Sequence, residues 1–522
     1  MPLPLDNAGF WPPLDIRPYI DQAEAAAAWW SGDRDDLAAT SHSTGTGASR
    51  RKFWQRRKTG DATTTTHHVH APLAGDIAAV SAELLYGDFP NLVTDDTAAQ
   101  AQLEETVETI GLQNLMLEAA EVAAATGGVY LRQTWDTRVA DHPLMQSFPQ
   151  TNAVPDFRYG RLFGVSMWEE VDRVGGTIWR HLERHEPGRV LHGLYVGSEV
   201  NLGTSIPLTE LPATADYQPE VLLPGRLRDR MLVQYVPNAL PNRKLKSRPL
   251  GRADWVGCED FLDALDETWT SLMRDIRIGQ ARILLPEEWV TKGGRPGTQS
   301  TFDVDDEAFI KLHVAQSEQQ KLETFQPDLR IDQHLAGTVA LMERIVSACG
   351  YSPQTFGMDI KGSAHSGTAL RIREGKTKNT MVKKQGYHTP GLQQAVVNLL
   401  DIGYEVWGTP TIADPKKNPA KVGWAAISMD PAENATMIQT LRTAEAISIR
   451  TAVKMAQPDL DEDDVDEEVA LIQSETAMAS PTDPFHPATP GMEPPVAPID
   501  EAPPHDPATA TDLTPDDQPA VP

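Results

Sequence analysis

The chain has 522 residues, 40% of them hydrophobic, and carries 74 acidic against 46 basic side chains, for a net charge of −28. This length has room for several domains with cores of their own. No apolar run reaches the roughly 18 residues that a membrane-spanning helix needs, so we expect no transmembrane segment. The acidic balance excludes a protein that grips nucleic acid over a broad basic surface.

Part of this charge lies at the C-terminal end. Residues 475–522 hold nine acidic residues and no lysine or arginine, and the remaining chain still has 65 acidic against 46 basic residues, or −19. Either DNA is no partner, or DNA slides over a mostly repulsive surface with a few localised bases.

The cysteine content points to a reducing, intracellular site of folding. Cys258 and Cys349 are the only cysteines. We therefore expect no disulfide framework and no thiolate metal cluster. The opening residues MPLPLDNAGFWPPLD lack the pattern of a secretion signal.

Residues 1–71 are predicted to form an N-terminal arm. Its basic segment, residues 50–58, places six bases around Phe53 and Trp54. This pattern fits a contact with nucleic acid or a partner, and fits slightly better a solvated arm anchored on a neighbour by its aromatic rings. His67, His68 and His70 follow, but nothing nearby has the ligand spacing of a metal site, so no metal is expected.

The next region changes from helical to β-rich. Residues 72–126 show a helical apolar stripe that ends at Gly127 and Gly128, and residues 129–237 indicate short antiparallel strands separated by turn residues. Within them His181 and His185 are interpreted as strand residues on a solvent-exposed face.

Two helices are predicted to flank a small β-rich excursion. An apolar stripe marks the first helix, residues 258–280, and another marks residues 332–350. Between them, residues 281–331 hold two strand-like pieces, ARILLP and LETFQP, around a glycine-rich turn and an acidic run.

A compact loop, residues 351–366, then leads into a basic helix expected to kink at Pro390. Lys361 and His365 are the only cationic candidates of the loop. A helix, a projecting loop and a basic helix can touch a phosphate backbone without reading bases. The helix contributes candidate bases for channel or intersubunit contacts: Arg371, Arg373, Lys376, Lys378, Lys383 and Lys384.

The C-terminal part is predicted to be helical and then disordered. Asp430 and Pro431 open a helix, and Val465, Val469 and Ile472 mark a further acidic helix. From residue 475 onward, 13 prolines predict disorder.

No catalytic motif appears along the chain. The phosphate-binding GxxxxGK[ST] motif, GxSxG, HExxH and CxxC are all absent. We therefore expect no enzyme and no cofactor. A metal-dependent nuclease stays open as an alternative, because the ligands of a two-metal site can be scattered in sequence.

Several segments, in their order, resemble portal proteins of tailed bacteriophages, and most closely those of long-tailed phages that infect actinobacteria. They include WWSGDRDDL, APLAGDIAAVSAELLYGDFP, LERHEPGRVLHGLYVGS, YVPNALPNRKLKSRPLGRAD, LDETWTSLMRDIRIGQARILLP and GYSPQTFGMD. The resemblance covers about residues 25–475. It implies an α+β portal fold with an α/β wing, a stem of long helices, a small β-rich clip and a helical crown.

The resemblance also implies where these parts lie. They are the wing at 72–257 and 367–429, the stem helices at 258–280 and 332–350, the clip at 281–331, the tunnel loop at 351–366, the crown at 430–474 and the acidic tail at 475–522. In the clip, the implied adaptor-facing residues are Lys292, Arg295, Asp303, Asp305 and Asp306.

Such proteins form rings, usually dodecamers, at one capsid vertex of the virion, after assembly in the host cytoplasm. The implied partners are further copies of the chain, double-stranded DNA, the large terminase, a head-tail adaptor, the major capsid protein and a scaffolding protein, with no membrane. The rival interpretations are a nuclease of the packaging machinery and another minor capsid or scaffold component.

Overall fold

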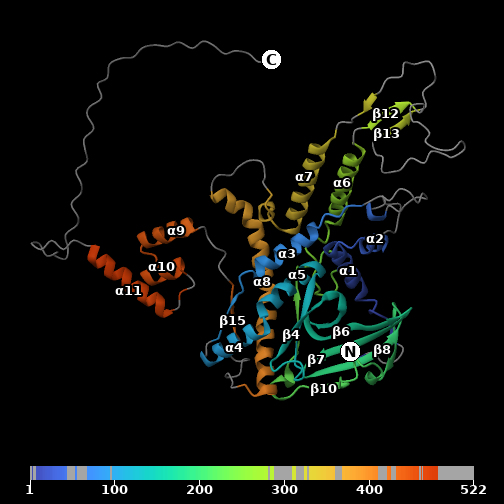
Figure 1. Ribbon diagram of the computed structural model, residues 1–522. Helices are drawn as coiled ribbons and strands as arrows, with labels where there is room; N and C mark the ends of the chain where they lie inside the picture. The colour runs from blue at the N-terminus through green and yellow to red at the C-terminus, as the bar shows by residue number, and fades with distance from the viewer. Residues whose placement is uncertain are drawn as a thin grey trace, which may run out of the picture. The chain divides into compact units, whose positions relative to one another are not determined.

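The computed structural model describes most of the chain. The described residues are 3, 8–43, 53–55, 68–94, 97–279, 282–286, 309–312, 323–325, 329–358, 367–409, 420–424, 431–457, 460 and 462–479. The chain divides into two compact units, Met1–Ile427 and Ser428–Pro522. Helices and strands mix in the first unit (Figure 1), so the fold is α+β. No helix in these ranges combines the length and the hydropathy that a membrane crossing requires.

The largest sheet has seven strands in the order β1-β9-β8-β7-β6-β5, with β10 paired to β8. The strands of the meander follow one another in sequence and pair antiparallel, as hairpins do. Their bounds are β1 Ala8–Phe10, β5 Ala153–Arg158, β6 Arg161–Val174, β7 Thr177–Glu186, β8 Arg189–Gly197, β9 Asn201–Ile206 and β10 Glu220–Leu222.

Tight turns set the register of this meander. Tyr159 and Gly160 connect β5 to β6, and both have positive φ angles of 50° and 78°, as a two-residue type I′ hairpin requires. Gly188 connects β7 to β8 with a φ of 80°, and a Cβ there would lie 2.1 Å from the Arg228 carbonyl oxygen. A side chain at this position is therefore excluded by both backbone conformation and space.

The interpretation of His181 and His185 as residues on a solvent-exposed face is wrong, because both are buried. β7 lies between β6 and β8, and both of its faces are covered. The Tyr217 ring stacks on His181, while His185 contacts the Glu183 carboxylate, which is also bonded by Arg132. Burial favours the neutral form of Glu183, but the bonds from His185 and Arg132 prevail and hold its pKa well below the usual value.

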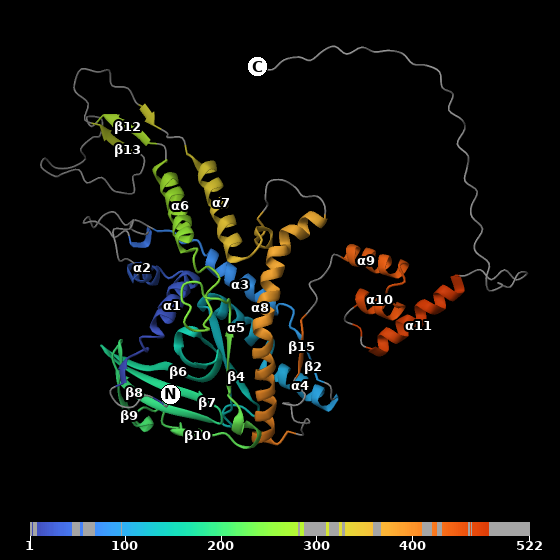
Figure 2. The same ribbon diagram turned by 180° about the vertical axis from the view of Figure 1, so that it is seen from behind.

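A second, three-stranded sheet lies at the centre of the first unit, in the order β11-β3-β4. These strands are β3 Gly128–Thr134, β4 Leu144–Pro149 and β11 Val233–Pro237. Helices cover this sheet (Figure 2): α3 Leu73–Tyr86, α4 Thr97–Ile110, α5 Leu112–Thr126 and the long α8 Gly367–Ile402, which continues through Pro390 and ends in a π-helical turn at Gly403–Trp407. The predicted helical region 72–126 is thus three helices, with the short strand β2 Asn91–Val93 between the first two.

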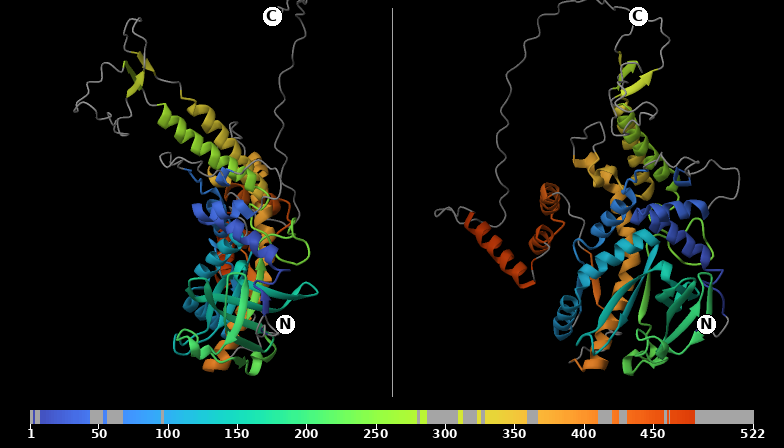
Figure 3. Two further views of the ribbon diagram at one scale, coloured as in Figure 1. Left: turned by 90° about the vertical axis from the view of Figure 1, so that its right-hand side faces the viewer. Right: turned by 45° about the vertical axis from the view of Figure 1, so that its right-hand side comes forward.

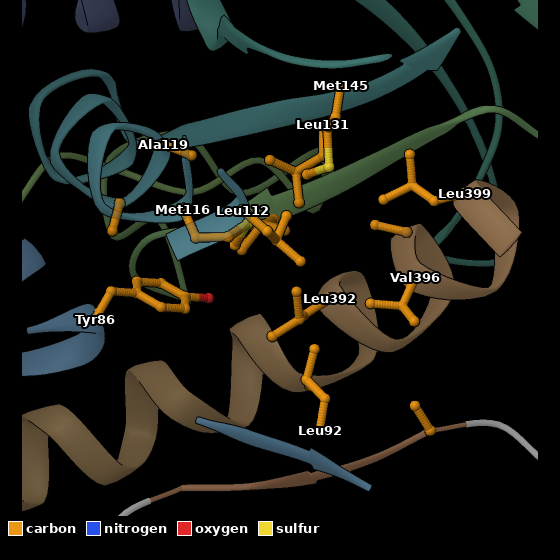
Figure 4. Close-up of a cluster of buried hydrophobic side chains, with 14 of the residues drawn as sticks. Tyr86, Leu92, Leu112, Met116, Ala119, Leu131, Met145, Leu392, Val396 and Leu399 are labelled. Atoms are coloured by element: carbon orange, nitrogen blue, oxygen red, sulfur yellow. The ribbon is translucent and has the colours of Figure 1, made fainter. Parts of the chain in front are cut away.

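The main core forms where α8 crosses α5 and the central sheet. Leu392, Val396 and Leu399 of α8 face Leu112 and Met116 of α5 (Figure 4). Strands β2 and β15, Lys421–Gly423, pair antiparallel at the edge of this core. Because α8 comes about 250 residues after α5 in the sequence, burial of its apolar face ties the late part of the chain to the early part.

A second core joins the N-terminal segment to the predicted stem helices. It contains residues of α1 Arg17–Ser31, α2 Arg34–Ser43, α6 Glu259–Ile278 and α7 Ile331–Cys349, around the fully buried Trp255. The described part of the N-terminal segment therefore packs on its own chain through α1. The helices α6 and α7 lie side by side (Figure 3) and begin and end within one or two residues of the expected ranges.

A small sheet connects the ends of these two helices, in the order β13-β12-β14. β12 Arg282–Pro286 and β14 Glu323–Phe325 fall within the two expected strand-like pieces and pair antiparallel. β13 Phe309–Leu312 was not expected, and it pairs parallel with β12. In the second unit, the described helices are α9 Pro431–Thr443, α10 Ile449–Ala456 and α11 Glu462–Ala479, and the Ser448 hydroxyl caps α10.

Two valines of α8 test whether this helix is held by its core face. Val396 is 1% exposed and Val382 is 55% exposed. We expect Val396→Ala to lower the free energy of unfolding by about 1.5–3 kcal/mol, because it removes buried methyl groups and leaves a cavity. Val382→Ala, the matched control, should change it by less than about 0.5 kcal/mol. Chemical denaturation followed by circular dichroism measures both, and equal losses would contradict this packing.

Candidate functional site

The residues predicted to face DNA or the adaptor fall largely outside the described part of the chain. Lys361 and His365 of the loop lie there, and so do the clip residues Lys292, Arg295, Asp303, Asp305 and Asp306. Arg371 and Arg373 belong to the backbone of α8, but their side chains are also outside the described residues. Among the predicted bases, the structure therefore gives side-chain contacts for the four lysines of α8.

The described start of the loop is bonded to α8. Gly350 ends α7 with a φ of 103°, and its carbonyl oxygen accepts a hydrogen bond from the Thr380 hydroxyl at 2.6 Å. The Ser352 amide donates to the Thr377 hydroxyl oxygen at 2.8 Å. These two threonines lie one turn apart on α8, so the chain leaves α7 along a fixed path.

A buried ion pair lies directly behind this path. The Lys384 ammonium donates to Asp254 Oδ2 at 2.7 Å and to the Ser81 hydroxyl at 2.6 Å, and the side chains of Lys384 and Asp254 are only 4% and 3% exposed. The Tyr351 hydroxyl donates to the same Asp254 oxygen at 2.8 Å, and Asn238 donates to the other one. Lys384 is therefore bound within its own chain and is not a surface base for DNA or a neighbour.

Burial shapes the protonation of this polar cluster. It lowers the pKa of Lys384, while the Asp254 carboxylate opposes that shift. One turn further along α8, burial and then the Lys384 charge lower the pKa of His388 to about 3. His388 is therefore neutral at neutral pH, with its Nδ1 atom 3.0 Å from the Tyr86 hydroxyl.

The other three lysines of α8 lie at or near the surface. Lys376 donates to the Ser347 hydroxyl at 2.8 Å and also to the Ser347 carbonyl oxygen. Lys383 donates to the Leu240 carbonyl oxygen at 2.8 Å, and Lys378 lies 4.0 Å from Glu374. Exposed contacts of this kind contribute little free energy, so they can be exchanged for other anionic partners.

A basic loop next to α8 adds to these lysines. We call residues 240–250 the basic loop. Arg243, Lys244 and Lys246 within it are exposed. Lys383 and Tyr387 of α8 both donate to its Leu240 carbonyl oxygen, which holds the loop against the helix. The four bases in PNRKLKSRPLG were visible in the sequence, but their position beside α8 was not.

The helices α6 and α7 expose apolar side chains although they pack on each other. Met273 and Ile276 of α6 are exposed, and so are Leu335 and Val339 of α7, at 41% and 46%. These residues repeat at three- and four-residue spacing, which forms a stripe on each helix. Large apolar side chains exposed together mark a surface that becomes covered by another protein.

A buried carboxylate fastens the N-terminal segment to α6. Asp266 accepts hydrogen bonds from Trp54 Nε1 at 3.1 Å and from the Ala71 amide at 2.8 Å, and it contacts His70 Nδ1 at 2.9 Å. The rings of Phe53 and Trp54 are therefore anchored on their own chain. The bases around these rings lie outside the described residues.

The histidines of this segment are used in packing. His68 lies against the Phe53 ring, and His70 is bonded to Asp266 while His67 is outside the described residues. In the described part of the chain, no cluster of three or more histidine, cysteine or acidic side chains is arranged to hold a metal ion.

Comparison with known proteins gives one family. The model of the family described as "Phage portal protein, SPP1 Gp6-like" matches residues 193–482, which is more than half of the chain. The matched range contains α6, α7, the small sheet between them, α8 and the three helices of the second unit. A search of curated proteins finds no match.

The buried pair predicts a large effect of a single charge. Lys384→Met should lower the free energy of unfolding by about 3–5 kcal/mol, because it leaves the Asp254 carboxylate buried without its cation. Lys383→Met, at the neighbouring exposed position, should cost less than about 0.5 kcal/mol. Adding Asp254→Asn to Lys384→Met should recover part of the loss. Denaturation curves of the four proteins measure this, and equal effects of the two lysine variants would contradict it.

Proposed function

The chain belongs to the SPP1 Gp6-like family of phage portal proteins, and from this premise we propose that its copies form a ring, a dodecamer, at one vertex of the capsid. In this proposal double-stranded DNA passes through the ring during packaging and ejection. As members of a portal family are structural components of the virion, the chain itself carries out no catalysis. The family match does not favour the nuclease or the other minor capsid component considered from the sequence.

The observation that carries the ring is the apolar surface of α6 and α7. Two antiparallel helices that expose Met273, Ile276, Leu335 and Val339 have burial left to gain, and a neighbouring copy offers it. When one face of a subunit packs on a different face of the next, the contacts are heterologous, and they form a ring when the rotation between successive copies closes. We therefore assign α6 and α7 to the stem.

The remaining parts follow the chain in this proposal. The wing comprises residues 72–257 and 367–429, the clip residues 281–331, the tunnel loop residues 351–366 and the crown residues 430–474. The clip would present the surface for the head-tail adaptor, through Lys292, Arg295, Asp303, Asp305 and Asp306. Its sheet has β13 and β14 as outer strands among the described residues, which supports pairing with strands of a neighbouring copy.

Other partners belong to the same proposal. The large terminase would dock on the ring to pump DNA, and the major capsid protein and a scaffolding protein would contact the wing during assembly. The long-tailed, actinobacteria-infecting type of phage is likewise proposed from the sequence resemblance.

DNA would meet the ring at the tunnel loop. Tyr351 and Ser352 are fastened to Asp254 and α8, so the loop has a fixed root. From that root Lys361 and His365 would approach phosphates, with Lys376, Lys378 and Lys383 as further bases for phosphates or for carboxylates of neighbouring copies. Contacts to phosphate carry no sequence information and weaken with salt, so they guide DNA without stopping it.

Assembly can be tested on the apolar stripe of α7. Leu335→Asp together with Val339→Asp should abolish rings, because a carboxylate in a packed interface loses its hydration. The matched control is Val174→Asp, a valine that is 62% exposed in the wing sheet. Mass photometry and negative-stain electron microscopy of the purified proteins show the outcome. Rings that persist in the double variant would refute the assignment of α6 and α7 to the stem contact.

The DNA path can be tested at the loop. Lys361→Ala with His365→Ala should leave the ring intact but reduce DNA packaging or retention in particles, with a weaker dependence of retention on salt. Arg138→Ala removes an exposed wing cation and serves as the charge control. Protected DNA in particles, measured after nuclease treatment over a salt series, is the readout. If the double loop variant retains DNA as the unaltered protein does, the loop bases do not contact DNA.

A further inference from the structure

The two cysteines of the chain meet at the base of the helix pair α6 and α7. Cys258 is the residue before α6, and Cys349 is the last residue of α7. Their thiols are close enough to shift each other's pKa, and Cys258 belongs to the core around Trp255 while Cys349 packs against it. Cys258 is buried and Cys349 is partly exposed. Two thiols in contact at the ends of two antiparallel helices form the geometric precondition of a disulfide.

The charges around this pair favour one reactive thiolate. The hydrogen bond from Cys349 lowers the pKa of Cys258, and the Arg252 and Arg344 cations act in the same direction against burial and Glu259. The pKa of Cys349 is raised, first by that same bond and then by burial. One thiol is thus prepared to attack, and the other remains protonated next to it.

We propose that Cys258 and Cys349 form a reversible disulfide within one chain when the protein meets a low-molecular-weight disulfide. In the first step the Cys258 thiolate attacks one sulfur of that disulfide, forms a mixed disulfide and releases a thiolate. In the second step Cys349 gives up its proton, its thiolate attacks the Cys258 sulfur and a second thiolate leaves. The small disulfide is reduced to two thiols, and the two cysteines are oxidised.

This bond would join the residue before α6 to the last residue of α7. It would close a loop of about 90 residues that includes both helices and the sheet between them, and such closure stabilises a fold by restricting its unfolded state. The angle between the helices would then be fixed at their base by a covalent link in addition to packing. Disulfide formation itself does not depend on the proposed function. Where each state occurs rests on that function: the thiols would be reduced in the host cytoplasm, and the disulfide would form in particles after release.

The test uses the purified full-length chain. One sample is incubated with oxidised glutathione and one with reduced glutathione, and both are quenched by alkylation under denaturing conditions. We expect the oxidised sample to lose two hydrogens in intact mass and to resist alkylation. We also expect a protease cut between α6 and α7 to leave fragments that separate only after reduction. Thermal unfolding should shift to higher temperature in the oxidised sample and return when reduced glutathione is added.

Cys258→Ser and Cys349→Ser are the matched controls. Neither can form the internal bond, so each should show separable fragments and no thermal shift. The experiment on the unaltered chain needs neither variant to fold. Two free thiols in the oxidised sample would overturn the proposal, and so would a disulfide that links two chains. Because ring formation is not needed for this readout, a negative result is distinguishable from failure of the proposed function.

Discussion

The ammonium of Lys384 connects three parts of the chain that lie far apart in sequence. Its partner Asp254 lies between β11 and α6 in the sequence, and the same carboxylate accepts a hydrogen bond from the Tyr351 hydroxyl at the start of the loop. A charge buried this deeply is tolerated only with its partners in place, so the position of α8 relative to α6 and α7 is fixed within narrow limits. The helices α6 and α7, the described start of the loop after α7 and the placement of α8 all depend on this one cluster.

Around this cluster, some side chains are bonded within the chain and others remain exposed. Polar contacts such as those of Asp266 hold α6 against the N-terminal segment, while apolar residues further along α6 and on α7 remain exposed. Lys376, Lys378 and Lys383 make contacts that water or another anion can replace. In the proposed ring, the buried contacts would hold the shape of each subunit, and the exposed side chains would be left for contacts with neighbouring copies.

The sequence predicted those elements whose pattern is local. The bounds of α6 and α7 were predicted closely, because apolar residues in an amphipathic helix repeat every three or four positions. The repeats run through Phe261, Leu265 and Trp269 and through Leu335, Val339 and Met342. The sequence did not predict β13, because its four residues are too few to show the alternation of apolar and polar side chains that marks a strand. The exposed face assigned to His181 and His185 was wrong, because the Tyr217 ring that covers His181 and the Arg132 side chain that bonds Glu183 beside His185 come from segments more than 30 residues away.

For the candidate site, too, the sequence predicted local features and did not predict contacts between distant segments. The basic character of α8 was readable, but which lysine lies inside the fold was not. Lys383 and Lys384 are adjacent in sequence, and only the helix orientation makes one exposed and the other buried. The contact between Cys258 and Cys349, and the position of the basic loop beside α8, depend on packing of distant segments. Such pairings have no signal in a single sequence.

The anchoring of the N-terminal segment has a consequence for synthesis on the ribosome. Trp54, His70 and Ala71 bond to Asp266, β1 pairs with β9, and Tyr19 bonds to the basic loop at Ser247 and Arg248. All of these partners and strands are made about 190–230 residues later, which at the usual rate of synthesis is roughly 10–45 s. During that interval the Phe53 amide and the Trp54 ring lack Asp263 and Asp266, the carboxylates of α6 to which they bond. The N-terminal segment therefore completes its packing only after α6 has been made.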